Sequence, residues 1–309
     1  MKRAERVGAM ISILTSSPCK TYSLQYFCDL LGAAKSSISE DIKACNISLE
    51  LAGSGRLETV SGARGGVRFV PHISDHKLRE LQDEFCQKLS DPSRMLGGNF
   101  LYTSDIFFDP AFISRIATVF VRKFKDRGAD YVATVETKGI PLAADVARLL
   151  DLPLVIVRRE AKVSEGSTVS INYFSGSYDR IQRMSMSKRA IRPGAKVIVI
   201  DDFMRGGGSV TGISEIINEF GGRVVGVGVA ISSKEPVKKR VSEYTAIVYL
   251  GNVDESSKMN QMVKKIMDLN QLEFGYNTLT MEHFDIIAMI RAVIAKSDIL
   301  LKQKEINLA

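Results

Sequence analysis

The sequence predicts an α/β protein, a mainly parallel β-sheet with helices on both faces, preceded by a small helical domain that ends in a β-hairpin. Two observations carry this prediction. Beyond residue 130, short apolar runs rich in Val and Ile alternate with amphipathic helical runs, which is the order that builds a parallel sheet. Before residue 75, three helical patterns come first and two short strands follow. A length of 309 residues suits two domains.

Three amphipathic runs open the chain, at residues 4–14, at 23–31 and from Lys35 onward. In the third run, Ser36 or Ser37 can cap the helix. Ile38, Ile42 and Cys45 follow the i, i+4, i+7 spacing of one helix face. We therefore expect these three side chains to point inward and their polar neighbours to point outward.

Two short strands follow at 57–60 and 67–70, joined by the glycine-rich turn 61–66 with Arg64 at its tip. Three helices and a hairpin indicate a winged helix, whose third helix would enter the major groove of DNA while the tip reaches phosphate or the minor groove. The residues expected to contact DNA are Arg3, Arg6, Lys35, Ser36, Ser37, Ser39, Lys43 and Arg64. The alternative is a small helical dimerisation module with a solvated charged face.

The larger domain should begin with a connecting helix over 76–89 and a long helix over 111–127. The expected core face of that long helix carries Ile113, Ile116, Ala117, Phe120 and Phe124. Strands are expected at 131–135, 154–157, 197–200, 224–231 and 246–250, and helices at 141–150 and 209–220. Ligands of such sheets bind at the carboxyl ends of the strands.

The run Val197–Gly212 combines a buried strand, two adjacent carboxylates and a glycine-rich turn. Glycines let a backbone approach a ligand closely, and free N–H groups at a helix start can bind an anion. Asp201 and Asp202 would repel phosphate, but they accept hydrogen bonds from sugar hydroxyls, directly or through Mg²⁺. Ser209 and Thr211 add hydroxyl donors. The run indicates a ribose 5-phosphate site; a turn with two capping Asp residues explains neither the paired acids nor the three glycines.

This run resembles the phosphoribosyl pyrophosphate (PRPP) signature of type I phosphoribosyltransferases, and it lacks the Lys of a Walker loop. A second loop, Glu136–Pro141, is similar to the pyrophosphate loop of purine phosphoribosyltransferases, with a Lys-Gly turn that offers N–H donors and an ammonium group. The segment Gly166–Ser177 looks like the hairpin that closes over the ligand in these enzymes and excludes water. An ordinary surface hairpin is the alternative.

Residues 1 to about 275 together resemble the purine operon repressor family of Gram-positive bacteria, through residues 34–41, 137–143, 165–173 and the signature. The resemblance implies a homodimeric repressor of purine biosynthesis genes that binds a double-stranded DNA operator and uses a phosphoribosyltransferase fold as a sensor, without catalytic residues. PRPP is then the effector, an inducer that weakens DNA binding, with Mg²⁺ as a candidate companion and a guanine nucleotide alarmone as a candidate competitor. The expected effector-binding residues are Tyr102, Thr137, Lys138, Gly139, Asp201, Asp202, Phe203, Met204, Arg205, Gly206, Gly207, Gly208, Ser209 and Thr211.

Two other functions stay open. An active purine phosphoribosyltransferase would use the same loops, because such enzymes work largely by positioning and charge stabilisation. Phe203 or Tyr102 would then lie against the base, although a winged helix has no use in such an enzyme. A protein-interaction module with a degenerate ligand site is the third function, and the intact loops argue against it.

The composition indicates the cellular compartment of the protein and the chemistry of its partners. The net charge of +7 favours anionic partners, either nucleic acid or phosphorylated metabolites. Four cysteines without a Cys-x-x-Cys pair fall on apparent helix faces and indicate buried free thiols in the reducing cytoplasm: Cys19, Cys28, Cys45 and Cys86. With three His, no metal site is expected. The apolar run before Leu14 is too short for a convincing signal peptide, and no membrane span is expected.

We expect three parts along the chain, a winged-helix domain over 1–74, a phosphoribosyltransferase-like effector-binding domain over 75–277 and a C-terminal helical extension over 278–309. The extension lies beyond the family resemblance. Within it, residues 281–304 predict an amphipathic helix that would pack at a dimer interface or cover the core as a peripheral helix.

Overall fold

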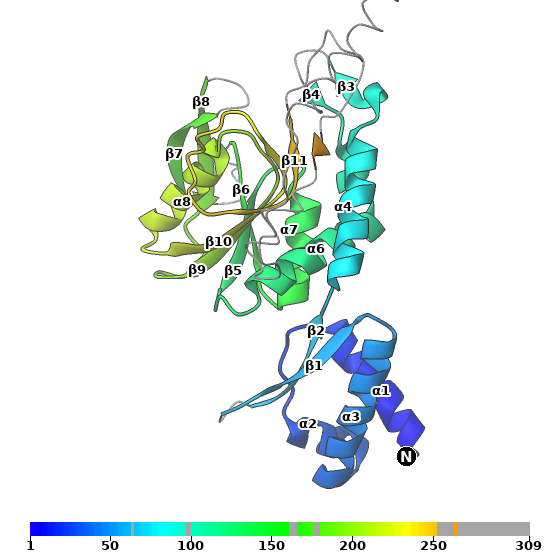
Figure 1. Cartoon of the computed structure of the whole chain (residues 1–309). Helices are drawn as coiled ribbons and strands as arrows, with labels where there is room; N and C mark the ends of the chain where they lie inside the picture. The colour runs from blue at the N-terminus through cyan, green and yellow to red at the C-terminus, as the bar shows by residue number, and fades with distance from the viewer. Residues whose placement is uncertain (63–64, 97–99, 161–165, 176–179, 252–262, 265–309) are drawn as a thin grey trace, which may run out of the picture. The chain divides into compact units, whose positions relative to one another are not determined.

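The computed structural model describes residues 1–62, 65–96, 100–160, 166–175, 180–251 and 263–264 (Figure 1). Arg64 and the helix expected over 281–304 lie outside these residues. The expected winged-helix order is confirmed as α1 (Arg3–Ser16), α2 (Leu24–Leu31), α3 (Lys35–Leu51), β1 (Gly55–Val60) and β2 (Gly66–Pro71). The two strands pair antiparallel from Gly55↔Pro71 to Val60↔Gly66.

Apolar side chains of all three helices form the core of this first part. Ile38 and Cys45 of α3 are fully buried beside Phe27 of α2, and Ile42 is half-buried against the same core. The expected cap of α3 is wrong. The N-cap residue of α3 is Ala34, which has an extended backbone, and the helix begins at the next residue, Lys35. Both serines therefore lie inside the first helical turn, and neither caps it.

A six-stranded sheet forms the centre of the remaining part, in the order β12-β11-β10-β9-β5-β6. All neighbouring pairs are parallel except β11 and β12. The strands are β5 (Tyr131–Val135), β6 (Leu154–Val157), β9 (Lys196–Met204), β10 (Arg223–Ser233), β11 (Thr245–Leu250) and β12 (Val263–Lys264). The expected mainly parallel sheet is confirmed.

Helices cover both faces of this sheet (Figure 1). One face carries α4 (Asp75–Leu89), α6 (Pro110–Phe124) and α7 (Ile140–Leu150). The other carries α8 (Gly208–Glu219) and the antiparallel hairpin β7 (Thr168–Ser175) and β8 (Arg180–Ser187). The shorter elements are the 3-10 turn η1 (Pro92–Arg94), β3 (Met95–Leu96), β4 (Phe100–Leu101) and α5 (Ser104–Phe107).

The apolar run of β9 explains why it lies at the centre. Ile198 and Ile200 pack on the face of α4, α6 and α7, whereas Val197 and Val199 pack on the face of α8, as the two-residue period of a strand requires. A strand buried on both faces is apolar throughout, in contrast to an alternating surface strand. On α6, all five residues of the expected core face are buried.

Candidate functional site

Asp201 and Asp202 lie inside β9, three and two residues before its end at Met204. The pairing of β9 with β10 continues through Asp201↔Val229 to Met204↔Ser232, so the turn begins only at Arg205. The prediction that the strand ends at residue 200 is therefore wrong. The backbone of the acid pair is held by the sheet rather than by a flexible loop.

The pKa values of these two carboxyls differ from those of an ordinary surface pair. Burial, followed by the charge of Asp202, raises the pKa of Asp201 well above its usual range. Burial also raises the pKa of Asp202, while its hydrogen bond with Asp201 and the charge of Lys138 act in the opposite direction. The charge of Arg159 favours the ionised form of Asp201. A cation or a pair of hydroxyl donors would stabilise the ionised pair further.

The turn 136–139 brings a second predicted loop against the acid pair. A Cβ atom on Gly139 would come within 2.8 Å of Oδ1 of Asp201 and 2.7 Å of the Thr134 hydroxyl, closer than real Cβ contacts. Only glycine allows this approach. Lys138 is half-buried and Thr137 is exposed. The structure therefore places the Thr137–Gly139 loop and the acid pair side by side.

The turn 205–207 leads directly from β9 into α8. Gly207 has a φ of +83°, a left-handed conformation that favours glycine, and α8 begins at Gly208. The first N–H groups of a helix have no partner within the helix. The hydroxyl of Thr211 donates to the Gly207 carbonyl at 3.0 Å, so its hydrogen is engaged inside the helix rather than free for a ligand.

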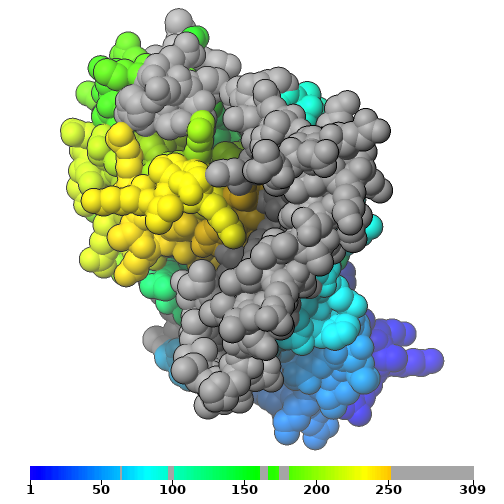
Figure 2. Space-filling view, turned by 45° about the horizontal axis from the view of Figure 1, so that its top comes forward, coloured from blue at the N-terminus to red at the C-terminus, as the bar shows by residue number. Residues whose placement is uncertain are grey.

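The segment 234–244, between β10 and β11, packs against this turn. The Lys239 ammonium donates to the carbonyls of Arg205 at 2.5 Å and of Ser233 at 2.6 Å. The Arg240 N–H donates to the Gly206 carbonyl at 2.9 Å. Most of this segment is exposed, and Figure 2 shows this part of the chain, in yellow, on the molecular surface.

Three further predicted residues have different surroundings. Tyr102 is exposed after β4, and its N–H donates to the Arg94 carbonyl at 2.8 Å. Phe203 is half-buried against the core that contains α4, α6 and α7, whereas Met204 is buried in the core that contains α8. Since a strand's side chains alternate, both of these residues contribute to packing at the end of β9.

The hairpin expected to close over the ligand is present as β7 and β8. It packs on α8, where a Cβ on Gly212 would come within 2.9 Å of Sδ of Met184 and 3.1 Å of the Tyr173 ring. Met184 and Tyr173 are buried. Residues 176–179 between the strands lie outside the described residues, and closure stays a prediction.

The predicted DNA-contacting residues cluster on α1 and α3. Lys35, Ser36 and Lys43 are exposed, and Ser37 and Ser39 are half-buried. The Nε atoms of Arg3 and Arg6 both donate to the buried carboxylate of Asp41, at 3.1 and 2.7 Å. The sequence did not indicate this shared partner. Arg3 keeps 63% of its side chain exposed, whereas Arg6 keeps 16%.

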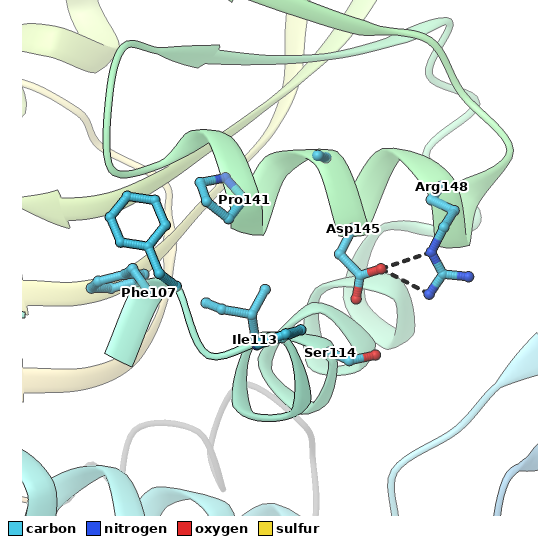
Figure 3. Close-up of a pocket in the computed structure, with 9 residues that line it drawn as sticks. Phe107, Ile113, Ser114, Pro141, Asp145 and Arg148 are labelled. Atoms are coloured by element: carbon cyan, nitrogen blue, oxygen red, sulfur yellow. Dashed lines mark hydrogen bonds and ion pairs between the residues drawn. The ribbon is translucent and has the colours of Figure 1, made fainter. Parts of the chain in front are cut away.

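A cavity of about 570 Å³ lies between α5, α6 and α7, and Pro141, the last residue of the predicted pyrophosphate loop, lines it (Figure 3). It is lined mainly by apolar side chains of α5, α6 and α7, and at one end the Arg148 guanidinium donates to Asp145 at 2.8 Å. None of the predicted effector-binding residues lines it. Its lining contains one acid, Asp145, and not the adjacent pair of acids that would hold the two ribose hydroxyls.

Among the described residues, no three His, Cys, Asp or Glu side chains are placed to hold a metal ion. The four cysteines carry free thiols, but Cys45 is buried whereas Cys19, Cys28 and Cys86 are half-buried, so the expected burial is confirmed for Cys45 alone. Cys19 is a turn residue with a φ of 62°, so its expected place on a helix face is wrong. No helix in the described part of the chain is long and apolar enough to cross a membrane.

Sequence reasoning missed two cations near the predicted loops. Arg159 follows β6, and its N–H donates to the Glu136 carboxylate at 2.7 Å, which ties the end of β6 to the turn after β5. Its place directly after a strand of the parallel sheet was the available signal. Lys239 had no such signal, because its contacts depend on how the segment after β10 folds back.

Comparisons with known proteins agree with both parts of the fold. The family model for the N-terminal region of bacterial purine repressors matches residues 2–71, and the phosphoribosyl transferase domain model matches residues 103–260. The purine biosynthesis transcriptional repressor PurR of Bacillus subtilis is 39% identical over 257 residues, covering 83% of this chain and 90% of the relative. The purine biosynthesis transcriptional activator PurR of Lactococcus lactis subsp. lactis is 36% identical over 258 residues, covering 84% and 95%.

A catalytic protein is also similar to part of the chain. The xanthine phosphoribosyltransferase of an Exiguobacterium species is 30% identical over 159 residues, covering 50% of this chain and 80% of the relative. The regulators match along most of the chain and include its DNA-binding N-terminal domain. The chain therefore belongs to the PurR family of purine biosynthesis transcriptional regulators.

Proposed function

We propose that the chain is a homodimeric repressor of purine biosynthesis genes, and that PRPP, bound in a phosphoribosyltransferase-type pocket without a catalytic role, acts as its inducer. The observation that carries the proposal is the contact between Gly139 and Asp201, which joins the predicted pyrophosphate loop to the predicted ribose-binding acids. The turn 205–207 and the first N–H groups of α8 follow in the same strand-to-helix connection. Each part of PRPP then has its own group of residues.

The chemistry of each group fits its part of the ligand. The carboxylates of Asp201 and Asp202 suit the two ribose hydroxyls, directly or through Mg²⁺ that accompanies the ligand. Main-chain N–H groups at the start of α8 suit the 5-phosphate, helped by the helix dipole. The half-buried ammonium of Lys138 suits the pyrophosphate. A guanine nucleotide that carries pyrophosphate would compete for the same groups.

Exposed residues on α1 and α3 support operator binding. Lys35, Ser36 and Lys43 are exposed along α3, and Arg3 is exposed on α1. Phosphate contacts by Lys and Arg hold a winged helix on DNA, and small polar side chains can reach base edges. The strongly anionic ligand would weaken DNA binding only if it binds the DNA-free state more tightly than the bound state.

Calorimetric titration with PRPP, with and without Mg²⁺, tests the pocket. We expect the wild-type protein to bind and the Asp201→Asn/Asp202→Asn protein, which keeps the size of both side chains, to lose binding at least tenfold. Equal binding by both proteins would contradict the site assignment.

The second candidate is an active purine phosphoribosyltransferase, which the similarity to xanthine phosphoribosyltransferase supports for half of the chain. Incubation with PRPP, Mg²⁺ and adenine, guanine, hypoxanthine or xanthine separates the two functions. We expect no nucleotide above the rate of a protein-free control. Nucleotide production that disappears in the Asp201→Asn/Asp202→Asn protein would establish catalysis.

A further inference from the structure

The carbonyl groups of the turn 205–207 are all held by hydrogen bonds from other parts of the chain or from α8. The Arg205 carbonyl accepts from Lys239, the Gly206 carbonyl accepts from the Arg240 N–H, and the Gly207 carbonyl accepts from the first turn of α8. Within the described part of the chain, the N–H groups of Gly206 and Gly207 have no hydrogen-bond acceptor. The turn therefore has satisfied acceptors and unused donors.

Peptide geometry determines where these donors point. In a planar trans peptide, the C=O of one residue and the N–H of the next point in opposite directions. Both peptides of the turn are trans. When Lys239 holds the Arg205 carbonyl on the side of segment 234–244, the Gly206 N–H points to the other side. The bond from Arg240 to the Gly206 carbonyl orients the Gly207 N–H in the same way.

The sheet order identifies the other side of the turn. Segment 234–244 leaves from β10 and enters β11, and both of these strands lie on one side of β9. On the opposite side β9 is followed by β5, which leads into the turn with Lys138 and Gly139. The two glycine N–H groups therefore face the proposed ligand pocket.

From this geometry we propose that Lys239 is a positioning residue, which holds the Arg205 carbonyl outward so that the glycine N–H groups are aimed at the 5-phosphate of the ligand. The inference rests on the proposed function of the pocket and adds a residue that does not itself touch the ligand. Lys239 is well suited to this task because its single ammonium group bridges the end of β10 and the turn after β9, through Ser233 and Arg205. Close packing supports the arrangement, since a Cβ on Gly207 would lie 3.0 Å from Val241.

Three variants separate positioning from simple charge attraction. Lys239→Met removes the ammonium and keeps the length of the side chain, and Lys239→Arg keeps donors for two carbonyls. Lys238→Met is the matched control, because Lys238 is exposed in the same segment and carries the same charge. The probes for calorimetry are PRPP, ribose 5-phosphate, and pyrophosphate, which we assign to the Thr137–Gly139 loop. Thermal unfolding of each variant reports on folding.

We expect Lys239→Met to bind PRPP and ribose 5-phosphate about tenfold more weakly than wild type, as loss of one charge-assisted hydrogen bond predicts. Lys239→Arg should recover most of this loss, Lys238→Met should change affinity less than about threefold, and pyrophosphate affinity should stay at the wild-type value. Equal losses of PRPP affinity in the Lys239→Met and Lys238→Met proteins would overturn the inference. So would a Lys239→Met protein that loses as much affinity for pyrophosphate as for PRPP. A wild-type protein that binds neither sugar phosphate would contradict the proposed function itself.

Discussion

Gly139 lies so close to Asp201 that a Cβ atom on the glycine would stand 2.8 Å from the carboxylate oxygen Oδ1. The two residues belong to different strand-to-helix connections, the turn after β5 and the end of β9. Their contact forms because neighbouring parallel strands end at the same edge of the sheet. The proposed ligand site depends on this juxtaposition.

Replacing Gly139 with Ala should therefore disturb the pocket. The added methyl group meets Oδ1 of Asp201 and the Thr134 hydroxyl, which belong to short, buried side chains with little room to move. We expect PRPP affinity to fall at least tenfold and the free energy of unfolding to fall by about 1–3 kcal/mol. Calorimetry and urea unfolding measure both quantities.

The same substitution at Gly8 is the matched control. Gly8 lies inside α1, and a Cβ there would meet nothing within 4 Å. Gly8→Ala should raise the free energy of unfolding by about 0.5–1 kcal/mol, because alanine favours a helix, and should leave PRPP affinity unchanged. A Gly139→Ala protein with wild-type affinity and stability would show that the two loops do not touch.

The raised pKa of Asp201 predicts a stability cost that depends on pH. A carboxyl whose pKa is higher in the folded than in the unfolded chain lowers the free energy of unfolding as pH rises through that pKa. Asp201→Asn removes this cost and keeps an oxygen for the Asp202 N–H, which now donates to Asp201 at 3.0 Å. We expect the variant to be more stable than wild type at pH 7, by about 1 kcal/mol, although it loses ligand affinity.

Denaturant unfolding at several pH values checks this prediction with an internal control. Below about pH 3 the wild-type carboxyl is protonated in both the folded and the unfolded state, so the difference in stability between variant and wild type should become much smaller. A variant that is less stable than wild type at pH 7 would contradict the assigned direction of the pKa.

Arg3 should contribute one phosphate contact to operator binding. Asp41 holds its Nε, which leaves the exposed terminal nitrogens for DNA. We expect Arg3→Ala to weaken operator binding several-fold and to lower the slope of log affinity against log salt by about 1. Arg79→Ala, which removes an exposed Arg of α4, should keep the wild-type slope. An unchanged slope in Arg3→Ala would remove Arg3 from the interface.

The buried thiol of Cys45 and the half-buried thiols of Cys19 and Cys86 should react slowly. Burial raises the pKa of Cys19, Cys45 and Cys86 to about 11, and the thiolate is the reactive form. At pH 8 we expect iodoacetamide to modify these three residues at least tenfold more slowly in the folded protein than in urea, as peptide mass spectrometry would measure residue by residue. Equal rates of modification in both conditions would contradict the raised pKa values of these thiols.

Local patterns explain why most elements could be predicted from the sequence. The apolar run Val197–Ile200 and the periodic face of α6 are properties of short segments, and both are buried as expected. The end of β9 could not be predicted in this way, because it depends on pairing with β10, more than 25 residues away along the chain. The acid pair, the glycine turn and the Lys-Gly turn were recognisable because each is a contiguous motif.

Contacts between distant side chains escaped prediction. Lys239 reaches the Arg205 carbonyl across 34 residues, and Arg3 reaches Asp41 across 38. The residues that flank Lys239 and Asp41 in the sequence do not indicate which distant group either side chain contacts. Such contacts form only in the folded chain, whereas hydrophobic periodicity and capping residues can be recognised in the sequence itself.

Operator binding with and without PRPP tests the central claim most directly. Gel-shift titrations at one fixed salt concentration would compare the wild-type and Asp201→Asn/Asp202→Asn proteins on a purine biosynthesis promoter of the source genome. We predict that PRPP weakens wild-type binding at least tenfold, whereas the double variant binds DNA equally well with or without PRPP. Wild-type binding that PRPP leaves unchanged, or a double variant that PRPP still releases, would contradict the account.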